Sequence, residues 1–319
     1  MKRLRRSTFL VPGNVPDFIG KSRAIAADVL LFDLQDAIAR IDRAKLEARE
    51  MVTAALRQGG HVARELCVRV NNPGSPWIDD DIRAVVQAGA HSIMLSRAFG
   101  AADVMRAEAC IEATAPGCAV EILLEVDTPA MVLELEAVAR SATRVTGVSV
   151  AAGDFGLEMG VRVFGPERSA NEHWLAHCRS HLVAIARARG WNACDLPLAP
   201  PKDLDAVRAA MRASRSLGFD GVATVFPGHV AMANEVFGVS QAELAWARRI
   251  VAGWQQQDEG PHWNKSFRIV EGEMVFAPAH EYARRVLQLQ AVIEGDPQAL
   301  EHLRRHGLIS PDYLADRPD

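Results

Sequence analysis

Residues 120–127, VEILLEVD, carry the pattern that decides the fold. Every second residue from Val120 onward is aliphatic, so one face of a strand with this sequence is wholly apolar and fits beneath a layer of helices. The other face carries Glu121, Glu125 and Asp127. Because charges inside a protein are costly unless they are paired or bind something, we expect this face to line the lumen or the mouth of a closed barrel.

Seven further short apolar runs lie along the chain at a fairly steady spacing. They are residues 8–11, 29–33, 66–71, 92–95, 145–152, 193–196 and 221–226. Segments of helical composition separate them, for example residues 43–56, 78–87, 130–139, 175–189 and 204–216. Eight strands alternating with helices indicate parallel strands joined by crossovers. The count and the length predict an α/β fold of the (β/α)8 TIM-barrel type.

The pattern changes after the eighth strand. Residues 241–256 and 279–293 have helical patterns, residues 260–278 read as an irregular or hairpin stretch, and a polar tail follows. We therefore expect a TIM-barrel catalytic domain over residues 1–238 and a C-terminal helical extension over residues 239–319. The extension is expected to cap a barrel mouth or to lie at a subunit interface.

Charge and composition exclude several classes of partner. The net charge of −4 provides no global positive field for nucleic acid or an anionic membrane. The basic residues Lys2, Arg3, Arg5 and Arg6 read as a solvated tail. The apolar stretch after them stops at Pro12, too soon for a signal peptide, and no uncharged run approaches the ~20 residues that span a bilayer. These features predict a cytoplasmic protein.

The five cysteines are odd in number and none lies in a CxxC pair. A disulfide framework or a zinc knuckle is therefore not expected. They read as small core residues: Cys67, Cys110, Cys118, Cys178 and Cys194.

Charged residues gather where the predicted strands end, the position at which barrel enzymes build their active sites. They are Asp33, Arg69, Arg97, Asp127, Asp154 and Asp195. Simpler roles stay open for some of these residues and for Asp36. An aspartate after a strand often caps the next helix, which applies to Asp36 and Asp154. Arg69 is alternatively a structural ion-pair partner, and Arg97 reads as a pocket wall or surface residue.

Six short motifs at these strand ends resemble a known family. They are STFLVPG (7–13), DLQDAI (33–38), VRVN (68–71), EVDT (125–128), AGDFGLEMG (152–160) and GFDGVATVFP (218–227). In this order they are similar to RSxLFVPG, DLEDAV, VRVN, IET, GxxDLxxxxG and GFDGKxxIHP of citrate lyase β subunits. The chain thus resembles a divergent member of the citrate lyase β-subunit and HpcH–HpaI aldolase family, which includes malyl- and citramalyl-CoA lyases.

The resemblance implies an activity and a role for each matching residue. Arg69 would grip the substrate's carboxylate, Asp127 and Asp154 would hold Mg²⁺ or Mn²⁺, and Asp127 would also lie against the substrate. Asp33 and Asp36 would act beside the metal. The implied enzyme is a magnesium-dependent carbon–carbon lyase of the oxo-acid-lyase type. It would cleave or form a small hydroxy-carboxylate, or its CoA thioester, by retro-aldol or Claisen-type chemistry.

The residue types suit that chemistry on their own account. Mg²⁺ is commonly held by one or two carboxylates together with water and substrate oxygens. Bound in this way it acts as a Lewis acid and a template. A guanidinium nearby clamps a carboxylate with two hydrogen bonds or stabilises charge that forms on a carbonyl oxygen.

Several residues depart from the family pattern. Gln35 and Asp127 replace glutamates, Ser96-Arg97 replaces Pro-Lys, Phe226 replaces a histidine and Phe276 replaces a catalytic aspartate. The metal end of the site thus looks preserved and the acid–base end rewritten. Two alternatives follow: a non-catalytic or regulatory barrel that binds a carboxylate or acyl-CoA, or a malyl-type thioesterase.

The segment after the barrel also suggests assembly. In the family this segment caps the active site of a neighbouring subunit, and here it carries the large apolar residues Trp263, Phe267, Met274, Val275 and Phe276. Such a patch usually marks an interface. We expect a homo-oligomer, a trimer or a hexamer, with Phe276 near a barrel mouth.

Overall fold

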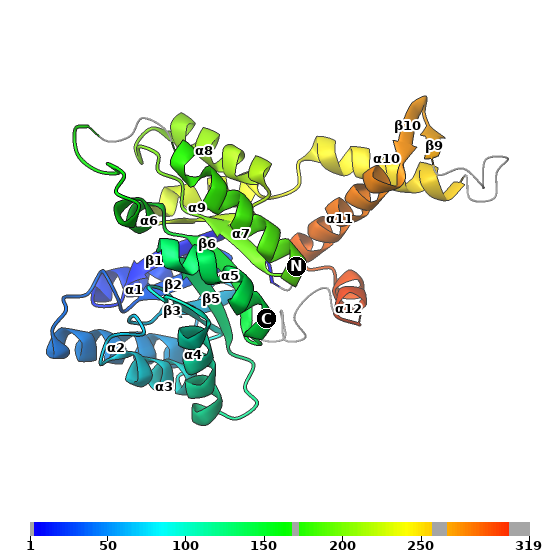
Figure 1. Cartoon of the computed structure of the whole chain (residues 1–319). Coiled ribbons are helices and arrows are strands. Elements are labelled where there is room, and N and C mark those ends of the chain that lie inside the picture. Colours follow the sequence, from blue (N-terminus) through cyan, green and yellow to red (C-terminus); the bar gives the residue numbers. More distant parts are fainter. Residues whose placement is uncertain (1–2, 168–171, 257–266, 306–319) are drawn as a thin grey trace. The chain divides into compact units, whose positions relative to one another are not determined.

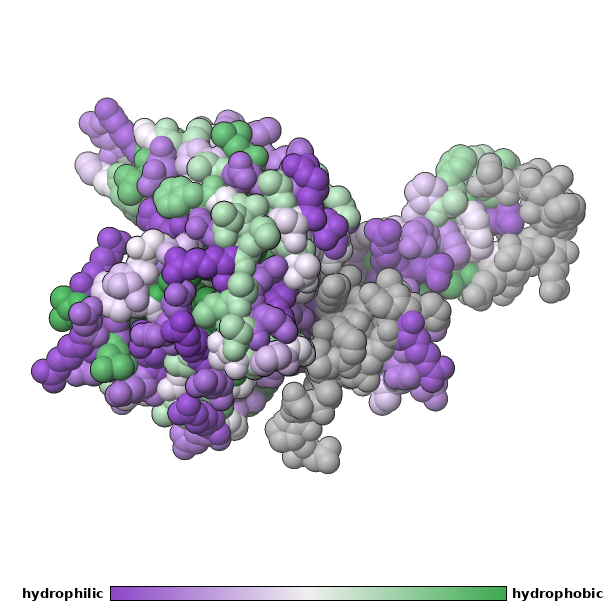
Figure 2. Space-filling model, turned by 60° about the horizontal axis from the view of Figure 1, so that its bottom comes forward, coloured by the Kyte–Doolittle hydropathy of each residue, from purple (hydrophilic) through white to green (hydrophobic). Residues whose placement is uncertain are grey.

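The computed structural model describes residues 3–167, 172–256 and 267–305. The chain divides into two compact units, with the boundary between Asn234 and Glu235. Within the described ranges, no helix is long and apolar enough to cross a membrane. Most of the described surface drawn in Figure 2 is hydrophilic, and its hydrophobic side chains are scattered, as is usual for a folded domain.

The first unit contains a closed barrel of eight parallel strands, which confirms the predicted fold (Figure 1). The strands are β1 (Ser7–Pro12), β2 (Val29–Asp33), β3 (Glu65–Arg69), β4 (Ser92–Leu95), β5 (Glu121–Val126), β6 (Val145–Val150), β7 (Asn192–Asp195) and β8 (Gly221–Thr224). Each strand pairs with the next one, and β8 pairs with β1. Side chains on the outer face of β5, such as Ile122 and Leu124, are fully buried.

Helices alternate with these strands and surround the barrel (Figure 1). They are α1 (Pro16–Ser22), α2 (Asp42–Gln58), α3 (Ile78–Gln87), α4 (Ala101–Thr114), α5 (Pro129–Ser141), α6 (Ala152–Glu158), α7 (Ala176–Arg189), α8 (Leu204–Leu217) and α9 (Pro227–Val236), with a 3-10 turn, His173–Leu175, before α7. Glycines in the left-handed conformation end two of them, Gly190 after α7 and Gly218 after α8. This is the usual glycine stop signal of a helix.

A glycine also closes the barrel. Ser7 and Phe9 of β1 pair with Val222 and Thr224 of β8. A Cβ atom on Gly221 would lie 2.0 Å from the carbonyl oxygen of Arg5. Only glycine therefore lets β8 approach β1 closely enough to complete the sheet.

The N-terminal end of the barrel lumen is filled by an ion-pair network. Arg5 is 3% exposed and binds Glu65 through Nε at 2.8 Å and Nη2 at 3.0 Å. Its Nη2 also donates to Glu121, which accepts a further bond from Arg3 Nε at 3.1 Å. Burial acts to raise the pKa of Glu121, but Arg5 and Arg3 outweigh it and hold that pKa at about 2. The expectation of a solvated tail is therefore wrong for Arg3 and Arg5, because inward-facing acids of β3 and β5 draw both side chains into the lumen.

The second unit is helical with one hairpin. It contains α10 (Gln241–Gln256), the antiparallel strands β9 (Phe267–Val270) and β10 (Glu273–Phe276), α11 (Ala277–Glu294) and α12 (Pro297–Arg305). Val270 and Val275 of the hairpin pack with Ile250 of α10 and Val286 of α11 in a small core. Helix α12 lies where the sequence reads as a polar tail. Trp263 lies outside the described residues.

Candidate active site

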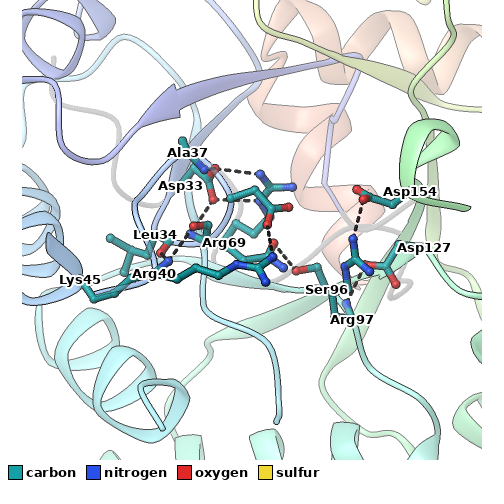
Figure 3. Close-up of polar contacts among 12 residues, drawn as sticks. Asp33, Leu34, Ala37, Arg40, Lys45, Arg69, Ser96, Arg97, Asp127 and Asp154 are labelled. Atoms are coloured by element: carbon teal, nitrogen blue, oxygen red, sulfur yellow. Dashed lines mark hydrogen bonds and ion pairs between the residues drawn. The ribbon is translucent and has the colours of Figure 1, made fainter. Parts of the chain in front are cut away.

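Charged side chains from five strand ends, those of β2 to β6, meet at the C-terminal mouth of the barrel and form two clusters (Figure 3). Asp33 ends β2 and Arg69 ends β3, and the two residues are directly paired in the sheet. Asp127 follows β5, and Asp154 lies in the first turn of α6, just after β6. Hydrogen bonds from Arg97, which follows β4, join the last two residues.

The first cluster is centred on Arg69. Its Nε and Nη2 atoms donate to the two carboxylate oxygens of Asp33 at 2.9 and 2.8 Å, and Nη1 donates to Glu125 at 3.2 Å. Burial alone would raise the pKa of Asp33, but hydrogen bonds and charge from Arg69 lower it overall. Burial raises the pKa of Glu125, and Arg69 offsets only part of that rise. Arg69 is thus held in a fixed orientation at the mouth.

Asp33 also shapes the loop that follows β2. Its carboxylate accepts backbone N–H bonds from Gln35 at 2.8 Å and Ala37 at 3.0 Å. Its carbonyl accepts a bond from Gly13 N at 2.9 Å, and a Cβ on Gly13 would lie 2.7 Å from that oxygen. The glycine after β1 therefore allows the chain to pass close to the site.

Two departures from the family pattern meet in one hydrogen bond. Ser96 Oγ donates to Gln35 Oε1 at 2.6 Å, and both residues are buried. Beneath this pair, Lys45 Nζ donates to the carbonyls of Leu34 and Gln35 at 2.8 and 2.7 Å. The sequence offered a signal for this lysine, because Lys45 shares the buried stripe of α2 with Ala48 at helical spacing.

The second cluster joins the two predicted metal ligands through Arg97. Its backbone N–H donates to Asp127 Oδ2 at 2.7 Å, and its Nη2 donates to Asp154 Oδ1 at 2.6 Å. Nη1 also lies 3.4 Å from Glu158. Arg97 has φ 53°, a left-handed conformation that costs a non-glycine residue about 1–2 kcal/mol. The sequence suggested a wall or surface position for Arg97, because neither its backbone conformation nor its contacts with Asp127 and Asp154 can be read from the sequence.

Asp127 has an acceptor atom that the protein leaves without a partner. Its side chain is 2% exposed, and Oδ1 is buried without a hydrogen-bond donor. Burial and the neighbouring Glu125 raise the pKa of Asp127 to about 7. Within the described ranges no group of three or more His, Cys, Asp or Glu residues could hold a metal ion. Two carboxylates completed by water and ligand oxygens are nevertheless a usual Mg²⁺ donor set, which Asp127 and Asp154 fit.

Two other acids that the sequence brought to attention lie outside these clusters. Asp195 faces the helix layer, where it accepts bonds from Arg179 Nε at 3.1 Å and Ser214 Oγ at 2.6 Å. Asp36 is an exposed loop residue whose side chain lies 3.8 Å from Arg40. Its charge acts on Arg69 and Lys45 without a hydrogen bond to either.

Phe226 and Phe276, which replace residues of the family pattern, lie in different units of the chain. Phe226 follows β8, is 42% exposed, and its ring centroid lies 5.1 Å from that of His229. The two ring nitrogens of His229 lie 3.3 Å from Thr224 Oγ1 and 3.0 Å from the Pro201 carbonyl, so this histidine is engaged in packing α9. Phe276 ends β10 in the second unit and is 52% exposed.

Comparison with known proteins gives consistent matches. The sequence profile of the HpcH/HpaI aldolase/citrate lyase family matches residues 6–227. A (3S)-malyl-CoA thioesterase of Cereibacter sphaeroides is 30% identical, with 85% of this chain and 89% of the relative covered. The citrate lyase subunit beta of Escherichia coli is 29% identical, with coverages of 89% and 93%. The crystal structure of CitE from Mycobacterium tuberculosis in complex with magnesium, acetoacetate and coenzyme A superimposes with a TM-score of 0.69 at 24% identity, covering 89% of this chain and 97% of that one.

Proposed function

The chain belongs to the HpcH/HpaI aldolase/citrate lyase family, and on this premise we propose that it is a Mg²⁺-dependent carbon–carbon lyase. Its substrate would be a small hydroxy-carboxylate or the CoA thioester of one. The substrates named for its relatives, malyl-CoA and citrate, are of this chemical type.

The observation that carries the proposal is the charge of the C-terminal mouth. Two arginines face five carboxyl groups there, and one oxygen of the buried Asp127 has no donor. A buried carboxylate oxygen without a partner is costly. A divalent cation held by Asp127 and Asp154 would supply the missing positive charge.

The residues of the mouth have separate tasks in this proposal. Mg²⁺, when bound, would act as a Lewis acid on the substrate's carboxylate and adjacent oxygen. Arg69, fixed by Asp33, would orient the carbonyl on which negative charge develops. In cleavage, the hydroxyl loses its proton, the carbon–carbon bond breaks and the hydroxyl carbon becomes a carbonyl. The electron pair of the broken bond remains on an enolate, which then takes up a proton.

Hydrolysis of a malyl-type thioester is the second candidate. It is favoured by the similarity to a (3S)-malyl-CoA thioesterase and by Phe276, which has no proton acceptor where malyl- and citramalyl-thioester lyases have an aspartate. Hydrolysis breaks the carbon–sulfur bond, adds water and releases a free thiol. Cleavage by a lyase releases an oxo acid or an aldehyde acid and leaves the thioester intact.

The test is a substrate panel in which both products are measured. Malyl-, citramalyl- and citryl-type CoA thioesters and free hydroxy-oxo acids are incubated with the protein and Mg²⁺, with and without EDTA. We expect metal-dependent release of an oxo compound, loss of that activity in Asp154→Ala and its retention in Asp79→Ala, which changes an acid of the outer helix α3. Release of free thiol alone would establish the thioesterase. No turnover across the panel would favour a barrel that only binds its ligand.

We also propose that the protein is a homo-oligomer and that the second unit contributes to its interface. The hairpin and α11 expose Ile269, Met274, Phe276 and Tyr282 by 41–54%. Light scattering is expected to show a trimer or hexamer that Phe276→Glu weakens, whereas Leu133→Glu, a change on the outside of the barrel unit, leaves it intact. A monomeric wild-type protein at all concentrations would contradict this proposal.

A further inference from the structure

Arg97 binds both acids of the proposed metal site. One residue contacts both acids, Asp127 through its backbone N–H and Asp154 through its guanidinium (Figure 3). It does so from a left-handed backbone conformation that favours glycine. A strained non-glycine residue persists only where surrounding contacts hold it, and such residues cluster at functional sites.

The two arginine side chains at the C-terminal mouth differ in how deeply they and their acidic partners are buried. The Arg69 side chain is 11% exposed and its partner Asp33 1%, with three hydrogen bonds to two acids. The Arg97 side chain is 24% exposed and its partner Asp154 34%. The second pair is therefore accessible to solvent and to an incoming ion, and the Arg97 side chain is freer to move.

A cation at Asp154 must compete with this guanidinium. The Oδ1 atom that Arg97 occupies is one of the two oxygens with which Asp154 could bind a metal. Two like charges brought this close repel each other, and partial burial weakens solvent screening. Arg97 thus stabilises the site without metal and opposes metal binding.

A ligand that carries a carboxylate removes the conflict. A guanidinium binds a carboxylate with two parallel hydrogen bonds, so an anionic ligand offers Arg97 an alternative partner. Once Arg97 has turned to the ligand, Asp154 is free to hold the cation. The two binding events then favour each other, and the linkage is reciprocal.

We propose that Arg97 is a positioning residue that couples metal binding to carboxylate binding, releasing Asp154 to the cation when the anionic ligand takes its guanidinium. The proposal rests on the metal site of the proposed function and adds a regulation of that site. Cation and substrate would then enter the mouth together, and the cation alone would bind weakly.

The test measures Mn²⁺ affinity by calorimetry or by electron paramagnetic resonance, with and without oxalate, in the full-length chain. Arg97→Met keeps the length of the side chain without its charge, and Arg97→Gly also relieves the backbone strain. We expect both variants to bind Mn²⁺ alone about tenfold more tightly than the wild type. The gain in affinity that oxalate provides should shrink by about the same factor, because oxalate chelates the metal in every variant and only the share due to Arg97 is lost. Arg83→Met, in which the lost ion pair with Asp80 is exposed, should behave like the wild type.

Three outcomes would overturn the proposal. Wild-type Mn²⁺ affinity and coupling in both variants would make Arg97 a surface residue. Weaker Mn²⁺ binding in both would mean that Arg97 holds Asp154 in place for the metal. Equal Mn²⁺ affinity in wild type and Asp154→Ala would remove the metal site itself, and with it the proposed function; this control separates that failure from the failure of Arg97 alone.

Discussion

The two ends of the barrel lumen both carry arginines and acidic residues, but basic and acidic groups are equal in number only at the N-terminal end. At the N-terminal end, Arg3 and Arg5 face Glu65 and Glu121, so positive and negative charges are equal in number. At the C-terminal end, Arg69 and Arg97 face the carboxyl groups of Asp33, Glu125, Asp127, Asp154 and Glu158, so acidic groups outnumber basic ones. The first end is closed by its own ion pairs, and the second is where we propose that a ligand binds.

The difference shows how one fold separates stability from function. Glu121 and Glu125 lie on the same face of β5, four residues apart, yet their surroundings lower the pKa of the first and raise that of the second. A buried charge that is fully paired supports the fold only while its partners remain. A charge left in excess costs stability until something binds, which is the usual trade-off of an active site.

Breaking the closed end should have the largest effect. Arg5→Met leaves Glu65 and part of Glu121 buried without a counter-ion, and we expect it to lower the free energy of unfolding by about 4 kcal/mol. Urea denaturation monitored by circular dichroism measures this change. Arg83→Met, which removes an exposed ion pair on α3, serves as the control. A loss no larger than that of the control would show that the closed end is not a stabilising network.

Replacing the guanidinium of Arg69 at the C-terminal end should affect function more than folding. Arg69→Lys keeps the charge between Asp33 and Glu125, so the protein should fold. A lysine cannot make the paired bonds of a guanidinium, and we expect kcat/KM for a carboxylate substrate to fall about 100-fold. Steady-state kinetics and thermal unfolding test the two parts. A variant that loses stability but keeps ligand binding would identify Arg69 as a structural ion-pair partner.

A Glu→Gln substitution on β5 should change the free energy of unfolding in opposite directions at the two ends of the lumen. Glu121→Gln removes a stabilising charge and should cost about 2 kcal/mol, whereas Glu125→Gln reduces the negative excess and should leave the metal-free protein as stable or up to about 1 kcal/mol more stable. Because the folded pKa of Glu121 is lowered to about 2, its contribution is present above the ordinary value of 4.5 and is lost as the pH falls toward 2. Urea titrations of both variants between pH 3 and pH 7 measure these effects. Destabilisation of equal size in both would refute the contrast.

The smallest effect concerns an unpaired histidine before β3. His61 packs edge-on against Phe32, and both of its ring nitrogens are buried without a partner. Burial, then the charge of Arg23, lowers its pKa below 6.5. The unfolded chain therefore binds the proton more readily, and stability falls as the pH drops below about 6.5. Replacing His61 by Gln should flatten this slope by roughly 0.5 kcal/mol between pH 7 and pH 5. An unchanged slope in His61→Gln would count against the assignment.

The strands were predictable because alternation and spacing depend on local sequence. The predicted runs at 29–33 and 92–95 coincide with β2 and β4. The run at 145–152 overran β6, because Ala152 already begins helix α6. Apolar residues fit the last residues of a buried strand and the first turn of a buried helix equally well, so the pattern of apolar residues cannot mark the boundary between them.

The site was predictable only in part. Asp33, Arg69, Asp127 and Asp154 stood out as charged residues at strand ends, and their catalytic and metal-binding roles stay predictions. Arg97 was missed as a contact of both acids, because a left-handed backbone at a non-glycine residue has no sequence pattern. Arg3 and Arg5 were misread because their partners lie on strands distant in the sequence. Asp195 shares the strand-end position but faces the helices, because side chains alternate along β7. Asn192 and Cys194 face the lumen, where they lie against Arg5 and Thr8, so Asp195 falls on the outer face.

The contact at Gly221 has a consequence for synthesis on the ribosome. Strand β1 is paired on one side with β2 and on the other with β8, so one edge of β1 stays open until Thr224 has left the exit tunnel. At usual rates of translation this takes on the order of tens of seconds. An open strand edge invites pairing with other chains. The first strand to be made is thus the last to be protected, and a nascent chain that stalls before Gly221 carries an unsealed barrel.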